Sequence, residues 1–71
     1  MKREQLLSAI RKWCRKNDAT FYSDAIAGKG SHMRVYVGAS QSTIIKSGEL
    51  PPGYVDLVLK QLGIPKNEIK R

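Results

Sequence analysis

MRVYVGASQSTIIK, residues 33–46, is the stretch that decides the fold of this chain. Over residues 33–37 apolar side chains alternate with longer polar ones, a pattern typical of a strand with one buried face. Residues 38–41 begin with a glycine and have the length of a hairpin connection. Residues 42–46 then indicate another short strand with several β-branched side chains. The stretch therefore predicts an antiparallel hairpin.

A further strand and its turn precede the hairpin. Residues 20–27 contain β-branched and aromatic side chains that favour a pleated surface. Gly28 and Gly30 then mark a turn before the hairpin begins. Together these segments predict a three-stranded antiparallel sheet.

Two amphipathic helices are predicted, one before the strands in the sequence and one after them. One covers residues 2–17, and its basic side chains lie mostly away from the apolar stripe. The other covers residues 52–62, where Pro52 suits the first turn and Gly63 suits a left-handed end. A short turn is expected over residues 65–69. The apolar stripes are Leu6, Leu7, Ile10, Trp13 and Cys14 in the first helix, and Val55, Val58, Leu59 and Leu62 in the second.

The element order α-β-β-β-α predicts an α+β fold with both helices on one face of the sheet. With 71 residues the chain has room for one domain, residues 1–71, and for a small core. The sequence contains no internal repeat and no linker. We therefore expect every functional residue to belong to this one domain.

The charge of the chain favours an anionic partner. Thirteen Lys and Arg residues against six Asp and Glu give a net charge of +7. The excess is concentrated in residues 1–46, which hold nine basic and three acidic side chains. This asymmetry favours nucleic acid or an acidic protein as the partner. A merely solvated basic surface is the alternative.

Cysteine content and hydropathy indicate the cellular compartment in which we expect this chain. Cys14 is the single cysteine, so it forms no disulfide within the chain, and we expect it to be a small buried apolar residue. No apolar run approaches the roughly 18 residues that span a membrane. The sequence offers no metal-ligand cluster, and no cofactor or metal is expected. A reducing cytoplasm is the simplest localisation.

The segment around His32 is the candidate site. His32 is the only histidine, and it stands directly before the predicted strand 33–37. Alternation along that strand places His32, Arg34 and Tyr36 on one face. The ordinary pKa of imidazole, about 6.5, allows it to accept or donate a proton near neutral pH. A histidine facing a polyanion is therefore a candidate proton-transfer group.

These features resemble the HicA toxin family of bacterial toxin–antitoxin systems. The resemblance covers nearly the whole chain: a basic first helix, the sequence GKGSH at residues 28–32, two hairpin strands and GYVDLVLKQLGI at residues 53–64. It implies a double-stranded-RNA-binding-domain-like fold, cleavage of mRNA without a metal, and neutralisation by a HicB-like antitoxin. It also implies that His32 is the catalytic residue. Many family members carry a Val-Pro-x-His segment after the third strand, whereas residues 44–48 here read IIKSG and contain no histidine.

Metal-free RNA cleavage assigns roles to the neighbours of His32. The 2′-hydroxyl of RNA attacks the adjacent phosphate when a base removes its proton and the leaving 5′-oxygen receives one. His32 could supply both transfers in turn. The supporting residues are Lys29 and Arg34 for the phosphate, Gly30 through its backbone N–H, Ser31 through hydrogen bonding, and Tyr36 by stacking on a base.

Two other functions fit the same residues. A non-catalytic RNA-binding module of the same fold would keep the basic surface and would not depend on His32. A protein-interaction subunit would use its charge only to dock an acidic partner. Steep salt dependence of RNA affinity favours phosphate contacts over the protein-only function.

Overall fold

The computed structural model describes residues 1–28, 30, 32–45 and 47–69. Its elements follow the predicted order, with a short 3-10 turn, η1, at the end. The bounds are α1 (Arg3–Lys16), β1 (Phe21–Ala25), β2 (Met33–Val37), β3 (Ser40–Ile44), α2 (Pro52–Leu62) and η1 (Lys66–Glu68). The α+β class is therefore confirmed.

The three strands form one antiparallel sheet in the order β1-β2-β3. Val37 pairs with Ser40, so the hairpin turn contains only Gly38 and Ala39. Gly38 has a φ of +58°, which suits the first central position of a two-residue turn of the II′ kind. The four-residue connection predicted over residues 38–41 is therefore wrong, because glycine allows the chain to reverse within two residues.

The ends of two strands differ from their predicted positions. β1 is shorter than the predicted strand over residues 20–27. β3 starts two residues earlier than predicted and stops at Ile44. The backbone N–H of Ile45 donates to the hydroxyl of Tyr54 on α2, at 2.9 Å, so this N–H bonds to a helix side chain and not to a neighbouring strand. Lys46, the predicted last strand residue, lies outside the described residues.

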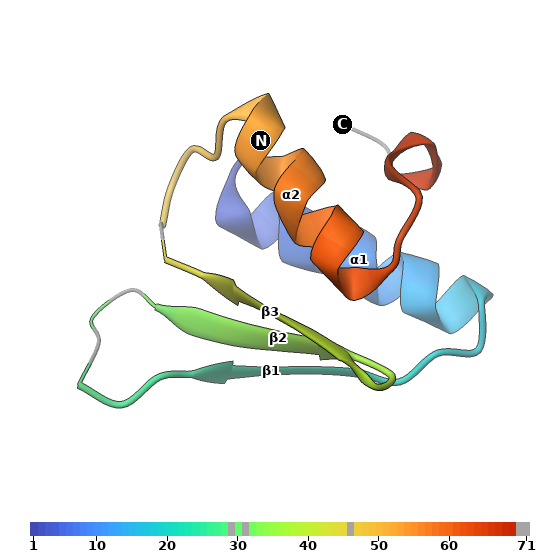
Figure 1. Cartoon of the computed structure of the whole chain (residues 1–71), viewed down its shortest axis with the longest axis horizontal. Coiled ribbons are helices and arrows are strands. Elements are labelled where there is room, and N and C mark those ends of the chain that lie inside the picture. The colour runs from blue at the N-terminus through green and yellow to red at the C-terminus, as the bar shows by residue number, and fades with distance from the viewer. Residues whose placement is uncertain (29, 31, 46, 70–71) are drawn as a thin grey trace.

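Both helices lie on the same side of the sheet (Figure 1). Along β2, Val35 and Val37 are buried while Arg34 is exposed, so the predicted alternation is confirmed. The inner faces of the strands and helices form one hydrophobic core. Its buried residues are Leu6, Ile10, Cys14, Val35, Val37, Ile44, Leu50, Val55, Val58, Leu59, Leu62, Ile64 and Ile69.

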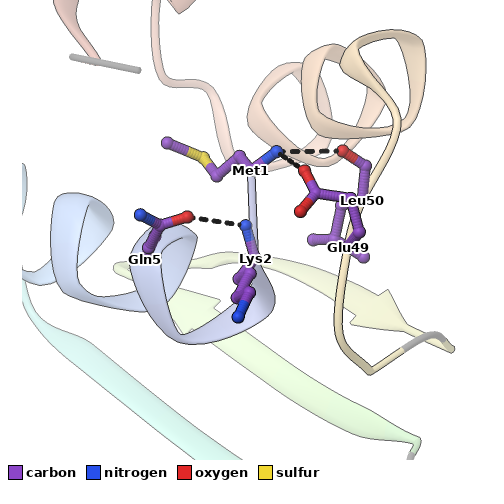
Figure 2. Close-up of polar contacts among 5 residues, drawn as sticks. All are labelled: Met1, Lys2, Gln5, Glu49 and Leu50. Atoms are coloured by element: carbon purple, nitrogen blue, oxygen red, sulfur yellow. Dashed lines mark hydrogen bonds and ion pairs between the residues drawn. The ribbon is translucent and has the colours of Figure 1, made fainter.

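The beginning of α1 is joined to the segment before α2 (Figure 2). The Met1 amino group contacts the carboxylate of Glu49, and the Leu50 N–H donates to the Met1 carbonyl at 2.7 Å. Lys2 and Glu49 form an isolated antiparallel bridge. The side chain of Gln5 accepts a hydrogen bond from the Lys2 N–H at 2.8 Å, which satisfies a donor at the start of the helix. These bonds fix the two helices relative to each other.

The end of the chain packs against both helices. Trp13 donates from Nε1 to Oε1 of Glu68 at 2.6 Å, which joins α1 to η1. The Lys66 ammonium lies 4.0 Å from the Asp56 carboxylate on α2. Gly63 takes the predicted left-handed conformation after α2. The second helix and the terminal turn are therefore confirmed where the sequence placed them.

Candidate nucleic-acid interface

The candidate site lies on the face of the sheet that neither helix covers. The strand register arranges the outward side chains of this face in two rows across the three strands. One row is Tyr22, Tyr36 and Gln41, and the next is Asp24, Arg34 and Thr43. Neither row contributes to the core, because its members are exposed or only half-buried. We call these six residues the outer face.

His32 extends the outer face by one further row. The Ile26 N–H donates to the carbonyl oxygen of His32 at 3.1 Å. This bond continues the register in which Ala25 pairs with Met33, so the β1–β2 ladder reaches beyond the ends of both strands. The histidine is half-buried, and its backbone is held by sheet pairing. His32 thus continues β2 by one residue and alternates in sequence with Arg34 and Tyr36.

Tyr36 has an aromatic partner that the sequence did not assign to the site. Tyr22 lies directly across from it on β1, with the ring centroids 5.7 Å apart and the ring planes tilted by 37°. Tyr22 is 56% exposed, the highest value among the large hydrophobic residues. The signal for this pair is the register between β1 and β2, which depends on the connection between these two strands.

Arg34 lies between an acidic and a neutral neighbour. Asp24 faces it from β1 and Thr43 faces it from β3. Among the described residues the Arg34 guanidinium forms no ion pair. Directly opposed Cβ atoms on paired strands are about 5 Å apart, so an acidic side chain starts beside that of Arg34.

A polar hollow of about 460 Å³ lies beside Arg34 at the β3 edge of the sheet. The hydroxyl of Ser42, one of its lining residues, donates to the side-chain oxygen of Gln61 on α2. The described residues that line the hollow include no carboxylate, so they present hydroxyl, amide and guanidinium groups to a ligand. Its lining residues are Arg34, Gln41, Ser42, Thr43 and Gln61.

The loop before His32 carries three of the predicted supporting residues. Gly30 has a φ of +62°, and a Cβ built on it would meet no atom within 4 Å. Glycine is therefore favoured there by backbone conformation, and the space beside its Cα is open. Lys29 and Ser31 lie outside the described residues, so their predicted roles stay predictions.

The basic residues of α1 belong to the other layer of the molecule. Arg11 places its guanidinium 5.3 Å from the ring centroid of Phe21, at the edge where α1 meets β1. An open groove of about 870 Å³ runs along α1 toward η1, and both Lys12 and Glu68 line it. This groove is larger than the hollow beside Arg34, but it has mixed charge and lies in the helix layer. It therefore does not adjoin His32.

Other site chemistry is limited in the part of the chain that the structure describes. Cys14 is buried in the core, and burial raises the pKa of its thiol, as expected of an unreactive apolar residue. Within the described ranges no three His, Cys, Asp or Glu side chains group as metal ligands do. None of the described helices has the length and apolar character needed to cross a membrane.

Comparison of the chain with protein-family models, with curated proteins and with solved structures finds no match. We therefore infer function from the residues of the outer face and from their chemistry.

Proposed function

We propose that this chain is an endoribonuclease that cleaves mRNA without a metal ion, and that it acts as the toxin of a HicA-like toxin–antitoxin pair. The element order and the two helices on one side of the sheet support a double-stranded-RNA-binding-domain-like arrangement. The net charge of +7 supports a polyanionic substrate.

One observation carries the proposal. His32 is held by sheet pairing directly before the first residue of β2, in alternation with Arg34 and Tyr36 on the face left open by the helices. Metal-free RNA cleavage needs proton transfer by a general base and acid, and it is helped by a cation that stabilises the phosphate and by an aromatic ring that holds a nucleobase. The sheet supplies all three from alternate positions of one strand.

The reaction would proceed by attack within the RNA itself. His32 removes the proton of a 2′-hydroxyl, and the resulting oxygen attacks the adjacent phosphorus. The bond from phosphorus to the 5′-oxygen breaks, and that oxygen takes up a proton from the imidazolium of His32. Arg34 stabilises the negative charge that grows on the phosphate oxygens. The products are a 2′,3′-cyclic phosphate end and a 5′-hydroxyl end.

Control by a HicB-like antitoxin in the cytoplasm belongs to the same proposal. An acidic antitoxin covering the outer face would exclude RNA from His32, and opposite charge would speed the encounter of the two proteins. This part is supported by the charge of the chain and by its resemblance to the family.

The decisive test incubates the purified chain with a defined single-stranded RNA in EDTA, beside His32→Ala and a DNA of the same sequence. We expect cleavage of RNA with cyclic phosphate ends, no cleavage of DNA because it lacks the 2′-hydroxyl, and no cleavage by the variant. Equal cleavage by both proteins would rule out His32, and loss of cleavage in EDTA would rule out a metal-free reaction.

A non-catalytic RNA-binding module is the second candidate. It is favoured by the absence of a second histidine from the sequence, because one histidine must then serve as both base and acid. Salt-sensitive binding that is equal in the unsubstituted chain and in His32→Ala, with no cleavage by either, would favour this candidate. Absence of RNA binding at low salt would instead favour an acidic protein partner.

A further inference from the structure

We propose that Tyr22 and Tyr36 together form a stacking platform for the bases of single-stranded RNA beside His32. This inference rests on the proposed function. It adds Tyr22 to the site and requires an unpaired substrate strand.

The first support is the geometry of the two rings. They lie in register on adjacent strands, 5.7 Å apart, and the Tyr22 side chain is 56% exposed. Tyr22 lies on β1, an edge strand of the sheet, and its ring pairs with the Tyr36 ring while more than half of the side chain stays open to solvent. Aromatic rings presented in this way stack on unpaired bases of any sequence.

The second support is the polar surroundings of the rings. Arg34 occupies the next row on the same strand, and the hollow at the β3 edge continues from it. Its guanidinium, hydroxyl and amide groups suit phosphate oxygens, and its described lining residues include no carboxylate. An aromatic pair flanked by such groups fits nucleic acid, which presents flat bases and phosphates together. An apolar protein surface would leave these polar groups unpaired.

The third support is the distance between the platform and His32. Tyr36 is four residues from His32 along the strand line, a separation of about 13 Å at the usual strand rise. The stacked bases therefore belong to nucleotides beside the cleaved linkage. Bases in an RNA duplex are stacked on one another and are inaccessible to such a platform, so the strand must be unpaired.

The binding experiment uses the His32→Ala chain, which leaves the RNA intact, and a short single-stranded RNA carrying one 2-aminopurine. Stacking on a tyrosine ring quenches the fluorescence of this base. We expect saturable quenching at low salt, and much weaker binding of the same RNA annealed to its complement.

Tyr22 is replaced by Thr, which keeps the strand propensity and removes the ring, and by Phe, which keeps the ring. We expect Tyr22→Thr to lose the quenching and to weaken RNA binding at least fivefold, since stacking of one base contributes about 1–3 kcal/mol. Tyr22→Phe should retain both. The matched control is Leu57→Ala, because Leu57 is 50% exposed on α2, away from the outer face. Tyr22→Leu serves in place of Tyr22→Thr if the latter does not fold.

The same substitution in the cleaving chain gives an independent readout. Tyr22→Thr should raise the KM for single-stranded RNA several-fold and leave kcat within about twofold, because His32 is unchanged. An abasic nucleotide placed beside the cleaved linkage should weaken binding of the unsubstituted chain and have little further effect on Tyr22→Thr.

The outcomes separate this inference from the proposed function. Unchanged quenching and affinity in Tyr22→Thr, or equal affinity for single-stranded and duplex RNA, would overturn the platform while His32-dependent cleavage stands. Absence of RNA binding by the unsubstituted chain at low salt would overturn both. Loss of quenching in Tyr22→Thr with no cleavage by any form would support the platform and overturn the nuclease.

Discussion

The backbone N–H of Ile26 donates to the carbonyl oxygen of His32 across 3.1 Å, one residue beyond the end of each strand. This bond closes the loop over residues 27–31 and ties the candidate catalytic residue to the sheet. Placement of His32 therefore depends on a neighbouring strand and not only on its own.

Removing this bond should affect the site more than the fold. Ile26→Pro deletes the donor and also fixes φ, so we expect a loss of at least about 1 kcal/mol in the free energy of unfolding, the usual contribution of one hydrogen bond. Cleavage of RNA should fall at least tenfold, because the His32 backbone is then free to move. Denaturant unfolding and initial cleavage rates measure the two effects. Ile26→Val keeps the N–H and should behave as the unsubstituted chain; a similar loss of cleavage in Ile26→Val would implicate the side chain instead.

The acidic neighbour of Arg34 should weaken RNA binding. Asp24→Asn removes a negative charge opposite the guanidinium, so we expect RNA affinity to rise about twofold to fivefold at low salt. The gain should shrink at high salt, where exposed charges are screened. The matched control is Asp18→Asn, which removes the same charge from an exposed residue outside the sheet, and asparagine tolerates its φ of +56°. An equal gain in both variants would show that only the net charge matters.

Two leucines of α2 should differ sharply in their contribution to stability. Leu59 is fully buried, whereas Leu57 is 50% exposed. We expect Leu59→Ala to lower the free energy of unfolding by about 2–5 kcal/mol, since it loses burial and leaves a cavity. Leu57→Ala should change it by about 0.5 kcal/mol or less. Chemical denaturation gives both values, and a comparable loss in the two variants would contradict the packing of this helix.

The contact between Met1 and Glu49 should make stability depend on pH. Hydrogen bonding and charge attraction from the Met1 amino group lower the pKa of Glu49 below its ordinary value of 4.5, and Lys2 adds a smaller effect. The stabilisation is therefore present above pH 4.5 and is lost as the pH falls through the lowered pKa. Glu49→Gln should have a slightly lower Tm than the unsubstituted chain at pH 7, and the gap should close in acid. The gap should be small because Glu49 is exposed; a gap that widened in acid would contradict the assignment.

Most of the fold could be predicted from the sequence because local signals agreed. Pro52 and Gly63 bracket α2, and its bounds are those predicted. Alternation along β2 fixed which face is buried. The start of β3 was missed because Ser40 and Gln41 are polar and were assigned to the hairpin connection. Ser42 is buried in spite of this, since its hydroxyl bonds to Gln61 on a helix that is distant in sequence.

The candidate site could be predicted only along one strand. His32, Arg34 and Tyr36 share a face because alternation is a local property. Tyr22 and Asp24 join them through the register between β1 and β2, and register is set by turn geometry and by the core that both strands share. Neither constraint is visible in a single stretch of sequence.

The bridge between Lys2 and Glu49 also bears on the order in which the parts of the chain fold during synthesis. The start of α1 docks on residues 48–50, so it must wait for the whole sheet to be synthesised before it finds its partner. A nascent chain emerging from the ribosome would expose the apolar side of α1 throughout that interval. We therefore expect the contact between residues 1–3 and 48–50 to form late in folding, because it closes a long loop of the chain.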